Sequence, residues 1–309
     1  MTRTPVYFVS HGSPSTMYDT THPAYSKMQD LGREITTSVK PAAVVVFSAH
    51  WQAENSNTIE VNVSESEPLL YDFYGFPKHY YMEKLQNRGS REVAQEVLAA
   101  LSGAGIKTVE VERGLDHGVF VPFKVMFGEG NHIDVPIVQV SLFEDDTNAE
   151  AHIKLGRAVE KLREENILII VSGMALPNLR DMQAARAYGR LMPYAVPFDN
   201  ALKEAAEQPA GSQRDEAMID LLRRPDARKA HPTFEHLLPA HVGVGAAGGD
   251  PGKQIWTFPE TSMSWAQYRW GRLATASAGA SCCTFEDEYM SREFAPDDCR
   301  HFIFYLFIR

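Results

Sequence analysis

The sequence predicts an α/β fold in which helices cover both faces of a mainly parallel central sheet, as a single domain with a C-terminal extension. Two observations predict it. Apolar runs rich in β-branched residues alternate with longer amphipathic stretches, the order typical of parallel sheets. The most apolar runs show no polar alternation, which is typical of strands buried on both faces. The length of 309 residues and the apolar content of 44% are enough for one large domain.

The first half of the chain alternates strands with helices. Residues 58–63 alternate polar and apolar side chains, as a half-buried strand does, and Ser90 is a suitable N-cap for the helix that follows it. The elements expected here are strands over 6–9, 43–47, 58–63 and 108–111, helices over 23–39 and 90–101, and an apolar segment over 115–127.

The second half continues the pattern. Residues 167–171, with the sequence ILIIV, form the most strand-like run of the chain. The helices over 198–208 and 215–224 are expected to face solvent. The other elements expected are strands over 135–142, 255–258 and 263–270, an amphipathic helix over 149–165, and a helix that opens within 231–239 and runs to the glycine-rich 243–249.

No internal repeat or linker interrupts residues 1–273, so we expect one catalytic domain there. Residues 274–309 differ, because they begin with a low-information stretch of small residues and end in the apolar sequence HFIFYLFIR. All three cysteines, Cys282, Cys283 and Cys299, lie in this tail. No disulfide framework is therefore expected to support the main body.

Charge and hydropathy exclude several classes of partner. The chain has 30 basic and 40 acidic residues, a net charge of −10, which argues against nucleic acid as the main partner. No apolar run approaches the roughly 20 residues that a bilayer span requires. The N-terminus enters a strand almost at once and lacks a signal-peptide pattern, so we expect a cytoplasmic protein. A homodimer is compatible with the sequence, which does not define the oligomeric state.

Four of the 11 histidines stand where a site is expected. His11 and His50 follow apolar strands directly, and ligand sites of α/β sheets collect at the carboxyl ends of strands. His117 lies in an Asp-His-Gly turn, and His236 lies beside Glu235. Three ligands from His11, His50 and either His236 or Glu235 would hold a catalytic metal with open positions. Imidazole suits Fe(II) and Zn equally, so the ligand type does not choose between them.

Six segments, in this order, resemble the DODA-type class III extradiol ring-cleavage dioxygenases, which are related to the catalytic subunit of protocatechuate 4,5-dioxygenase. They are HGSP (11–14), SAHW (48–51), YDFYGFP (71–77), LDHGVFVPF (115–123), SGMALPNLR (172–180) and HPTFEHLLP (231–239). The resemblance covers about residues 5–272. It implies a non-haem Fe(II) enzyme, often seen with zinc, that opens a catechol-type aromatic ring beside its hydroxyls with O₂.

Carried over by motif, the resemblance implies that His11, His50 and His236 bind the metal and that His117 is the active-site histidine. One position departs from the family pattern SG-x-x-x-HNLR, because Pro177 stands at the histidine position. Because proline has no titratable group, it provides no general acid–base catalysis at this position. Such catalysis typically raises the rate about 100- to 10,000-fold.

The departure at Pro177 leaves three interpretations open. His117 transfers the proton alone, with slow turnover; His231 or His241 substitutes for the missing histidine; or the chain is a weakened or inactive homologue that binds a metal or ligand.

Two further hypotheses concern the surroundings of the site. Tyr74, Phe76 and Trp51 either wall a flat aromatic substrate or pack in the core. Three imidazoles around an open metal position also activate water, so a zinc hydrolase is an alternative, although the sequence has no HExxH motif.

Overall fold

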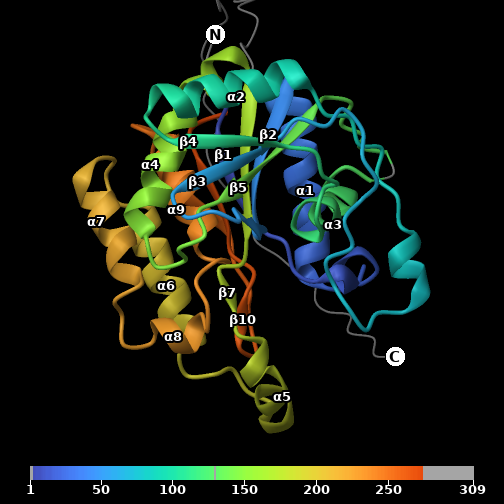
Figure 1. The fold of residues 1–309 in the computed structure, drawn as a ribbon. Helices are drawn as coiled ribbons and strands as arrows, with labels where there is room; N and C mark the ends of the chain where they lie inside the picture. The colour runs from blue at the N-terminus through green and yellow to red at the C-terminus, as the bar shows by residue number, and fades with distance from the viewer. Residues whose placement is uncertain (1–2, 129, 274–309) are drawn as a thin grey trace, which may run out of the picture. The chain divides into compact units, whose positions relative to one another are not determined.

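The computed structural model describes residues 3–128 and 130–273, in which eight strands form one sheet with the order β4-β3-β5-β2-β6-β1-β11-β8 (Figure 1). The four central strands β5, β2, β6 and β1 run parallel to one another. Antiparallel pairing occurs between β3 and β5 and among β1, β11 and β8. The strands are β1 Val6–Ser10, β2 Ala43–Gln52, β3 Thr58–Asn62, β4 Lys107–Val111, β5 Ile137–Leu142, β6 Ile167–Gly173, β8 Gly252–Trp256 and β11 Gln267–Trp270.

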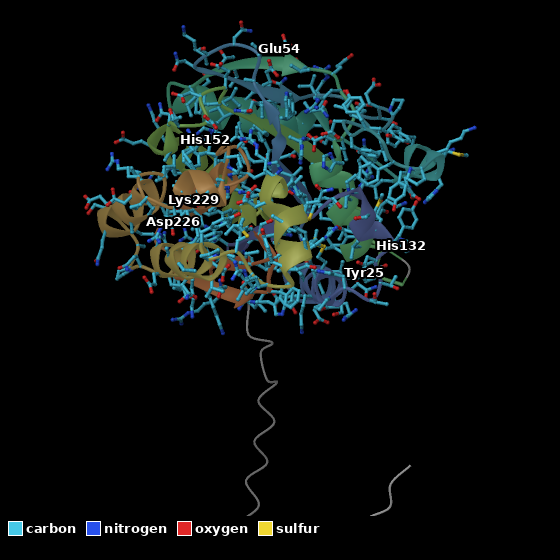
Figure 2. The ribbon with its side chains drawn as sticks, turned by 90° about the horizontal axis from the view of Figure 1, so that it is seen from below. Tyr25, Glu54, His132, His152, Asp226 and Lys229 are labelled. Atoms are coloured by element: carbon cyan, nitrogen blue, oxygen red, sulfur yellow. The ribbon has the colours of Figure 1, made fainter. Side chains whose placement is uncertain are left out.

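Helices cover both faces of the sheet, as predicted. α1 and α3 lie on one side in Figure 1, and α4 and α9 lie on the other. Seen from below, Tyr25 of α1 and His152 of α4 lie on opposite sides of the body (Figure 2). The helices are α1 Pro23–Glu34, α2 Arg91–Gly103, α3 His117–Met126, α4 Ala149–Val159, α5 Leu179–Tyr188, α6 Ala195–Ala206, α7 Ser212–Leu221, α8 Ala227–Ala230 and α9 Leu238–Ala247.

Shorter elements complete the fold around these layers. A π-helical turn extends α1, and a 3₁₀ segment extends α4. A small second sheet joins β7, β10 and β9 in that order. Their bounds are Ile35–Val39, Glu160–Glu165, β7 Leu176–Pro177, β10 Met263–Ser264 and β9 Pro259–Glu260.

The continuous apolar runs are explained by two cores, one on each face of the sheet. Along β2, Val44 and Val46 pack into the core beside α1 and α3. Val45 and Phe47 point the opposite way, into the core beside α4 and α9. Because successive side chains of a strand point to opposite faces, a strand covered on both sides must be apolar at every position. The predicted fold class is confirmed.

Three details of the sequence prediction were wrong. β2 does not end at Phe47 but continues to Gln52 through an irregular register, so His50 lies within the strand. Helix α6 does not simply face solvent, because its Phe198 and Leu202 are fully buried. The predicted strand over 263–270 is divided into β10 and β11, which belong to different sheets, and β11 pairs antiparallel with β1 and β8.

The predicted boundary at residue 273 coincides with the end of the described residues and stays a prediction. The tail, with Cys282, Cys283 and Cys299, lies outside them. Among the described residues, no helix combines the length and the apolarity that a bilayer crossing requires.

Candidate metal centre

The carboxyl ends of three adjacent parallel strands bring the first histidines together. β2, β6 and β1 are neighbours in the sheet, so His50 near the end of β2 and His11 just after β1 lie at one edge. His236 comes from the segment between α8 and α9. Its carbonyl accepts a hydrogen bond of 3.0 Å from the N–H of Met174, which directly follows β6. The fold thus fixes all three residues around the end of β6.

The Nε2 atoms of these three histidines converge. His50 Nε2 lies 3.2 Å from His11 Nε2 and 3.2 Å from His236 Nε2. One ligand nitrogen from each residue lies within 4.8 Å of the others. Whether this arrangement fits a metal depends on which ring nitrogens carry protons, and their hydrogen-bond partners answer that question.

His11 is held through its other nitrogen by a relay of three groups. The Ser172 hydroxyl donates to the carbonyl of Gly118, so its oxygen is free to accept from His11 Nδ1–H at 2.9 Å. The Gly118 carbonyl is available because the residue four positions later in α3 is Pro122, which has no N–H. His11 therefore carries its proton on Nδ1 and leaves Nε2 bare.

His236 is held by its neighbour in the chain. Its Nδ1 lies 2.9 Å from Glu235 Oε1, and a carboxylate accepts, so Nδ1 donates. Burial alone would raise the pKa of Glu235, but hydrogen bonds from His236 and Thr233 and the charge of His236 hold that pKa well below its usual range. Glu235, the alternative ligand in the sequence prediction, thus faces the far nitrogen of His236.

His50 is placed by its backbone and by a carboxylate. Its N–H donates to Ser48 Oγ at 3.2 Å, and its Nδ1 lies 3.5 Å from Asp72 Oδ2. A Cβ at position 118 would lie 2.9 Å from the His50 ring and 2.4 Å from Ser48 Oγ, so only glycine lets α3 approach this closely.

The donor set fits a divalent metal ion. Each Nδ1 faces an oxygen acceptor, so three bare Nε2 lone pairs face one another, and a cation relieves their mutual repulsion. Burial first, and then the charges of His236 and His117, hold the pKa of His11 and His50 well below the usual range. Neutral imidazoles are the form that binds metals.

His117 lies beside this group and begins α3. Its ring centroid is 3.8 Å from that of His50 and 6.0 Å from that of His11. Its Nδ1 lies 2.8 Å from Asp72 Oδ1 and donates to that carboxylate, so the neutral ring presents Nε2 as an acceptor. The structure therefore brings together the four histidines that the sequence singled out.

Two of the predicted substrate-wall residues, Trp51 and Tyr74, have different surroundings. Trp51 follows His50 in β2 and is buried, with its Nε1–H on Glu60 at 2.8 Å and the guanidinium of Arg113 over its ring at 4.1 Å. Tyr74 is 90% exposed. Phe73, which the sequence analysis did not name, places its ring centroid 5.7 Å from that of His117. The wall assignment of Trp51 and Tyr74 stays a prediction.

Phe76, which the sequence predicted as a wall residue, belongs to the same surroundings as two residues that the sequence did not predict, Asp72 and Ser172. Phe76 packs edge-on against Phe73 with 5.2 Å between centroids. Asp72 and Ser172 hold site histidines and were missed. Asp72 stands among the aromatic residues of YDFYGFP, and a single acid in such a segment is a signal that could have been used.

Pro177 lies at the edge of the small sheet, where β7 pairs it with Met263 of β10. His231 and His241, proposed as its substitutes, are fully buried and hydrogen-bonded to the backbone. His231 Nε2 donates to the Ala175 carbonyl at 2.9 Å, and His241 Nε2 donates to the Met218 carbonyl at 2.9 Å.

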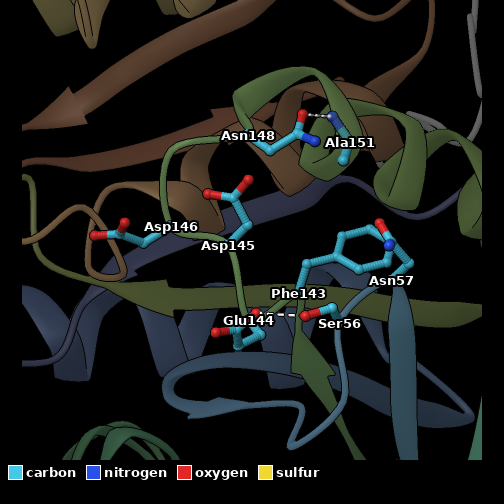
Figure 3. A pocket seen from close by; sticks show the side chains of 8 residues that line it. All are labelled: Ser56, Asn57, Phe143, Glu144, Asp145, Asp146, Asn148 and Ala151. Atoms are coloured by element: carbon cyan, nitrogen blue, oxygen red, sulfur yellow. Dashed lines mark hydrogen bonds between the residues drawn. The ribbon is translucent and has the colours of Figure 1, made fainter.

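A hollow of about 390 Å³ on the surface, beside the loop before α4, is separate from the histidines (Figure 3). Its three acids already have partners. Glu144 accepts from Ser56, Asp145 accepts from Thr147, and Asp146 accepts from the N–H of Phe234. Nothing in this hollow calls for a cation.

Comparison with known proteins now identifies the class. Residues 3–267 match the family described as the catalytic LigB subunit of aromatic ring-opening dioxygenase, and the chain belongs to that family. This confirms the resemblance seen in the sequence motifs.

Several named or solved proteins are similar to the chain. A "4,5-DOPA dioxygenase extradiol" of Beta vulgaris is 36% identical over 244 residues, 78% of this chain and 86% of that protein. A "4,5-DOPA dioxygenase extradiol-like protein" of Schizosaccharomyces pombe is 32% identical over 267 residues, 81% of this chain and 87% of that protein. The crystal structure of an uncharacterized Escherichia coli K12 protein superimposes with a TM-score of 0.69 at 27% identity, covering 87% of this chain and all of that one.

Proposed function

We propose that this chain is an extradiol dioxygenase that opens the ring of a catechol-type aromatic with O₂. The observation that carries the proposal is the convergence of three bare Nε2 atoms, each with its Nδ1 facing an oxygen acceptor. Membership of a ring-opening family supports this reaction over the hydrolysis that a three-histidine zinc site also permits.

In this proposal His11, His50 and His236 hold Fe(II), for which zinc can substitute in the purified protein. A bound iron ion would supply the positive charge that favours the deprotonated catechol and the redox capacity that O₂ requires. The three histidines leave the rest of the coordination sphere open to substrate.

His117 is the acid–base group in this scheme. With Nδ1–H bonded to Asp72, the neutral ring uses Nε2 to accept the catechol proton and returns it later to the opened product. Phe73 lies beside it and offers an apolar ring edge to a flat substrate. His231 and His241 donate their Nε2–H groups to backbone carbonyls, which leaves the role to His117.

Oxygen consumption tests the function. We expect Fe(II)-reconstituted protein, prepared without air, to consume one O₂ per catechol and to convert the ring to an open-chain product detected by mass spectrometry. Because the similar Beta vulgaris protein is named a 4,5-DOPA dioxygenase extradiol, DOPA stands first in a panel that also holds catechols with neutral and acidic substituents. No consumption with any catechol, beside a full complement of iron, would contradict the proposal.

Pro177 favours one second possibility, a homologue that binds metal or ligand with little turnover. Pro177→His distinguishes the two. A rise of about 100-fold or more in kcat would show that the proline weakened acid–base catalysis. An unchanged kcat in an active enzyme would show that His117 suffices.

A further inference from the structure

Asp72 connects His117 to the metal-binding group by three contacts from one carboxylate. Oδ1 accepts from the ring Nδ1–H of His117 at 2.8 Å and from its main-chain N–H at 3.0 Å. Oδ2 lies 3.5 Å from His50 Nδ1. We propose that Asp72 is a positioning residue, which fixes the place and the tautomer of His117 and ties it to His50. The inference rests on the proposed function only in assigning the proton transfer to His117.

The two hydrogen bonds to His117 do different things. The bond from the main-chain N–H fixes the first turn of α3 against the loop, and the bond from the ring fixes the rotation of the imidazole. Because a carboxylate only accepts, Nδ1 must carry a proton, and the neutral ring therefore presents its lone pair at Nε2. The ring of His50 on one side and the edge of Phe73 on another complete the enclosure.

Asp116, the carboxylate directly before His117 in the chain, does not accept these hydrogen bonds. Asp116 is the N-cap residue of α3, yet its side chain makes no capping bond and accepts instead from Ser48 and Gln139. Asp72 therefore takes the place of the cap at this helix end. Its loop is anchored directly beside the helix, since the N–H of Leu70 donates to the Leu115 carbonyl at 2.9 Å.

A second metal ion is the competing interpretation. One ligand atom each from His50, Asp72 and His117 lies within a group 4.8 Å across. The hydrogen bonds argue against it, because Oδ1 receives a main-chain N–H and an imidazole N–H at once. A backbone N–H is a hydrogen-bond donor and cannot bind a cation. Its contact with Asp72 Oδ1 therefore indicates that this oxygen accepts hydrogen bonds. The two interpretations predict different metal counts.

A double-mutant cycle on kcat tests the action through His117. Asp72→Ala should lower kcat about 10- to 100-fold in the wild-type background, the usual cost of losing such an outer partner. In the His117→Gln background the same change should alter kcat by about 2-fold or less. Equal effects in both backgrounds would overturn the proposal. Asp72→Asn keeps one acceptor oxygen and should fall between wild type and Asp72→Ala.

Loss of a helix cap needs its own control. Ser90 Oγ accepts from the Val93 N–H and caps α2, which forms no part of the site. Ser90→Ala should lower the melting temperature much as Asp72→Ala does and leave kcat and KM as in wild type. A parallel loss of kcat in Ser90→Ala would assign the effect of Asp72 to general stability.

Two measurements on the zinc-loaded protein test the role of Asp72 without requiring enzymatic activity. Nitrogen-15 correlation spectra should show His117 as the Nδ1–H tautomer in wild type and as Nε2–H or a mixture in Asp72→Ala, with His117→Gln used to assign the signal. Zinc content should be one ion per chain in both. The same tautomer in both proteins would overturn the proposal, as would a second ion in wild type that Asp72→Ala loses. Wild-type protein that consumes no O₂ would instead count against the proposed function, and the tautomer would still decide the role of Asp72.

Discussion

Two groups of three histidines in this chain differ in where their ring nitrogens point. Burial lowers the pKa in both groups: in His11 and His50 of the first, and in all three of the second. The first group turns its Nε2 atoms toward one another at 3.2 Å. The second group bonds backbone carbonyls at 2.8 to 2.9 Å. The first group consists of His11, His50 and His236, and the second group consists of His152, His231 and His241.

This comparison teaches that burial and a lowered pKa do not by themselves mark a metal site. A carbonyl only accepts, so each histidine of the second group must keep a proton on the nitrogen that faces it. In the first group the protons lie on the outer nitrogens, and the inner nitrogens share one space. Orientation therefore separates a ligand from a structural histidine.

The largest effect is expected when one histidine of the first group is removed. His50→Ala removes the central nitrogen of the three, so we expect the chain to lose its metal and with it all measurable O₂ consumption. Metal analysis after gel filtration without air checks this. His241→Gln is the matched control from the second group: it should cost stability, because the bond to the Met218 carbonyl is weakened, but keep one metal per chain. Retention of metal by His50→Ala would show that the three nitrogens are not the ligands.

A smaller effect separates the metal group from the residue beside it. His117→Ala should keep the metal and lower kcat about 100- to 10,000-fold, because only the acid–base contribution is lost. Metal content and stopped-flow oxygen consumption on the same sample distinguish the two properties. If iron is lost together with activity, His117 belongs to the ligand group instead.

A still smaller effect is expected when the group that accepts a hydrogen bond from a ligand histidine is removed. Ser172→Ala removes the oxygen that accepts from His11 Nδ1–H and leaves the ligand itself unchanged. We expect about 10- to 100-fold weaker metal affinity, measured by competition with a chelator of known affinity. The neighbouring Ser48→Ala, which loses the partner of the His50 N–H but no ring contact, should weaken affinity less. The reverse order would place the control of ligand orientation in the backbone.

The smallest effect concerns the second group and pH. Burial is the first cause that lowers the pKa of His231 to about 3 and that of His152 to about 4. The unfolded chain takes up these protons below about pH 6.5, whereas the folded chain does not. Stability is therefore complete above pH 6.5 and falls as the pH drops toward 4, by about 2 kcal/mol per histidine at pH 5.

Urea unfolding at pH 7, 6 and 5 measures this dependence. The difference between wild type and His152→Gln isolates one histidine, because every other group is shared. We expect that difference to change by about 2 kcal/mol between pH 7 and 5. Parallel curves for the two proteins would mean that His152 takes up its proton as readily when folded as when unfolded.

The sequence was sufficient for the fold class and for the meeting of His11 and His50, because both follow from strand ends in a parallel sheet. His117 and His236 were assigned to the same site by their motifs. Strand direction was not predictable at β3 or at the final pair, since alternation looks the same in either direction. Asp72 and Ser172 were missed for a different reason. Each contacts a residue far away in the chain, 45 positions for Asp72 with His117 and 161 for Ser172 with His11. Only tertiary packing brings such pairs together.

Pro122 carries a lesson for anyone who engineers this chain. A search for thermostabilising substitutions would select it early, because an interior proline costs a helix about 3 kcal/mol and alanine restores the missing bond. The restored amide at position 122 would then compete with the Ser172 hydroxyl for the Gly118 carbonyl. The substitution would stabilise the helix but release the Ser172 hydroxyl and weaken metal binding, so thermal stability and metal retention should be screened together.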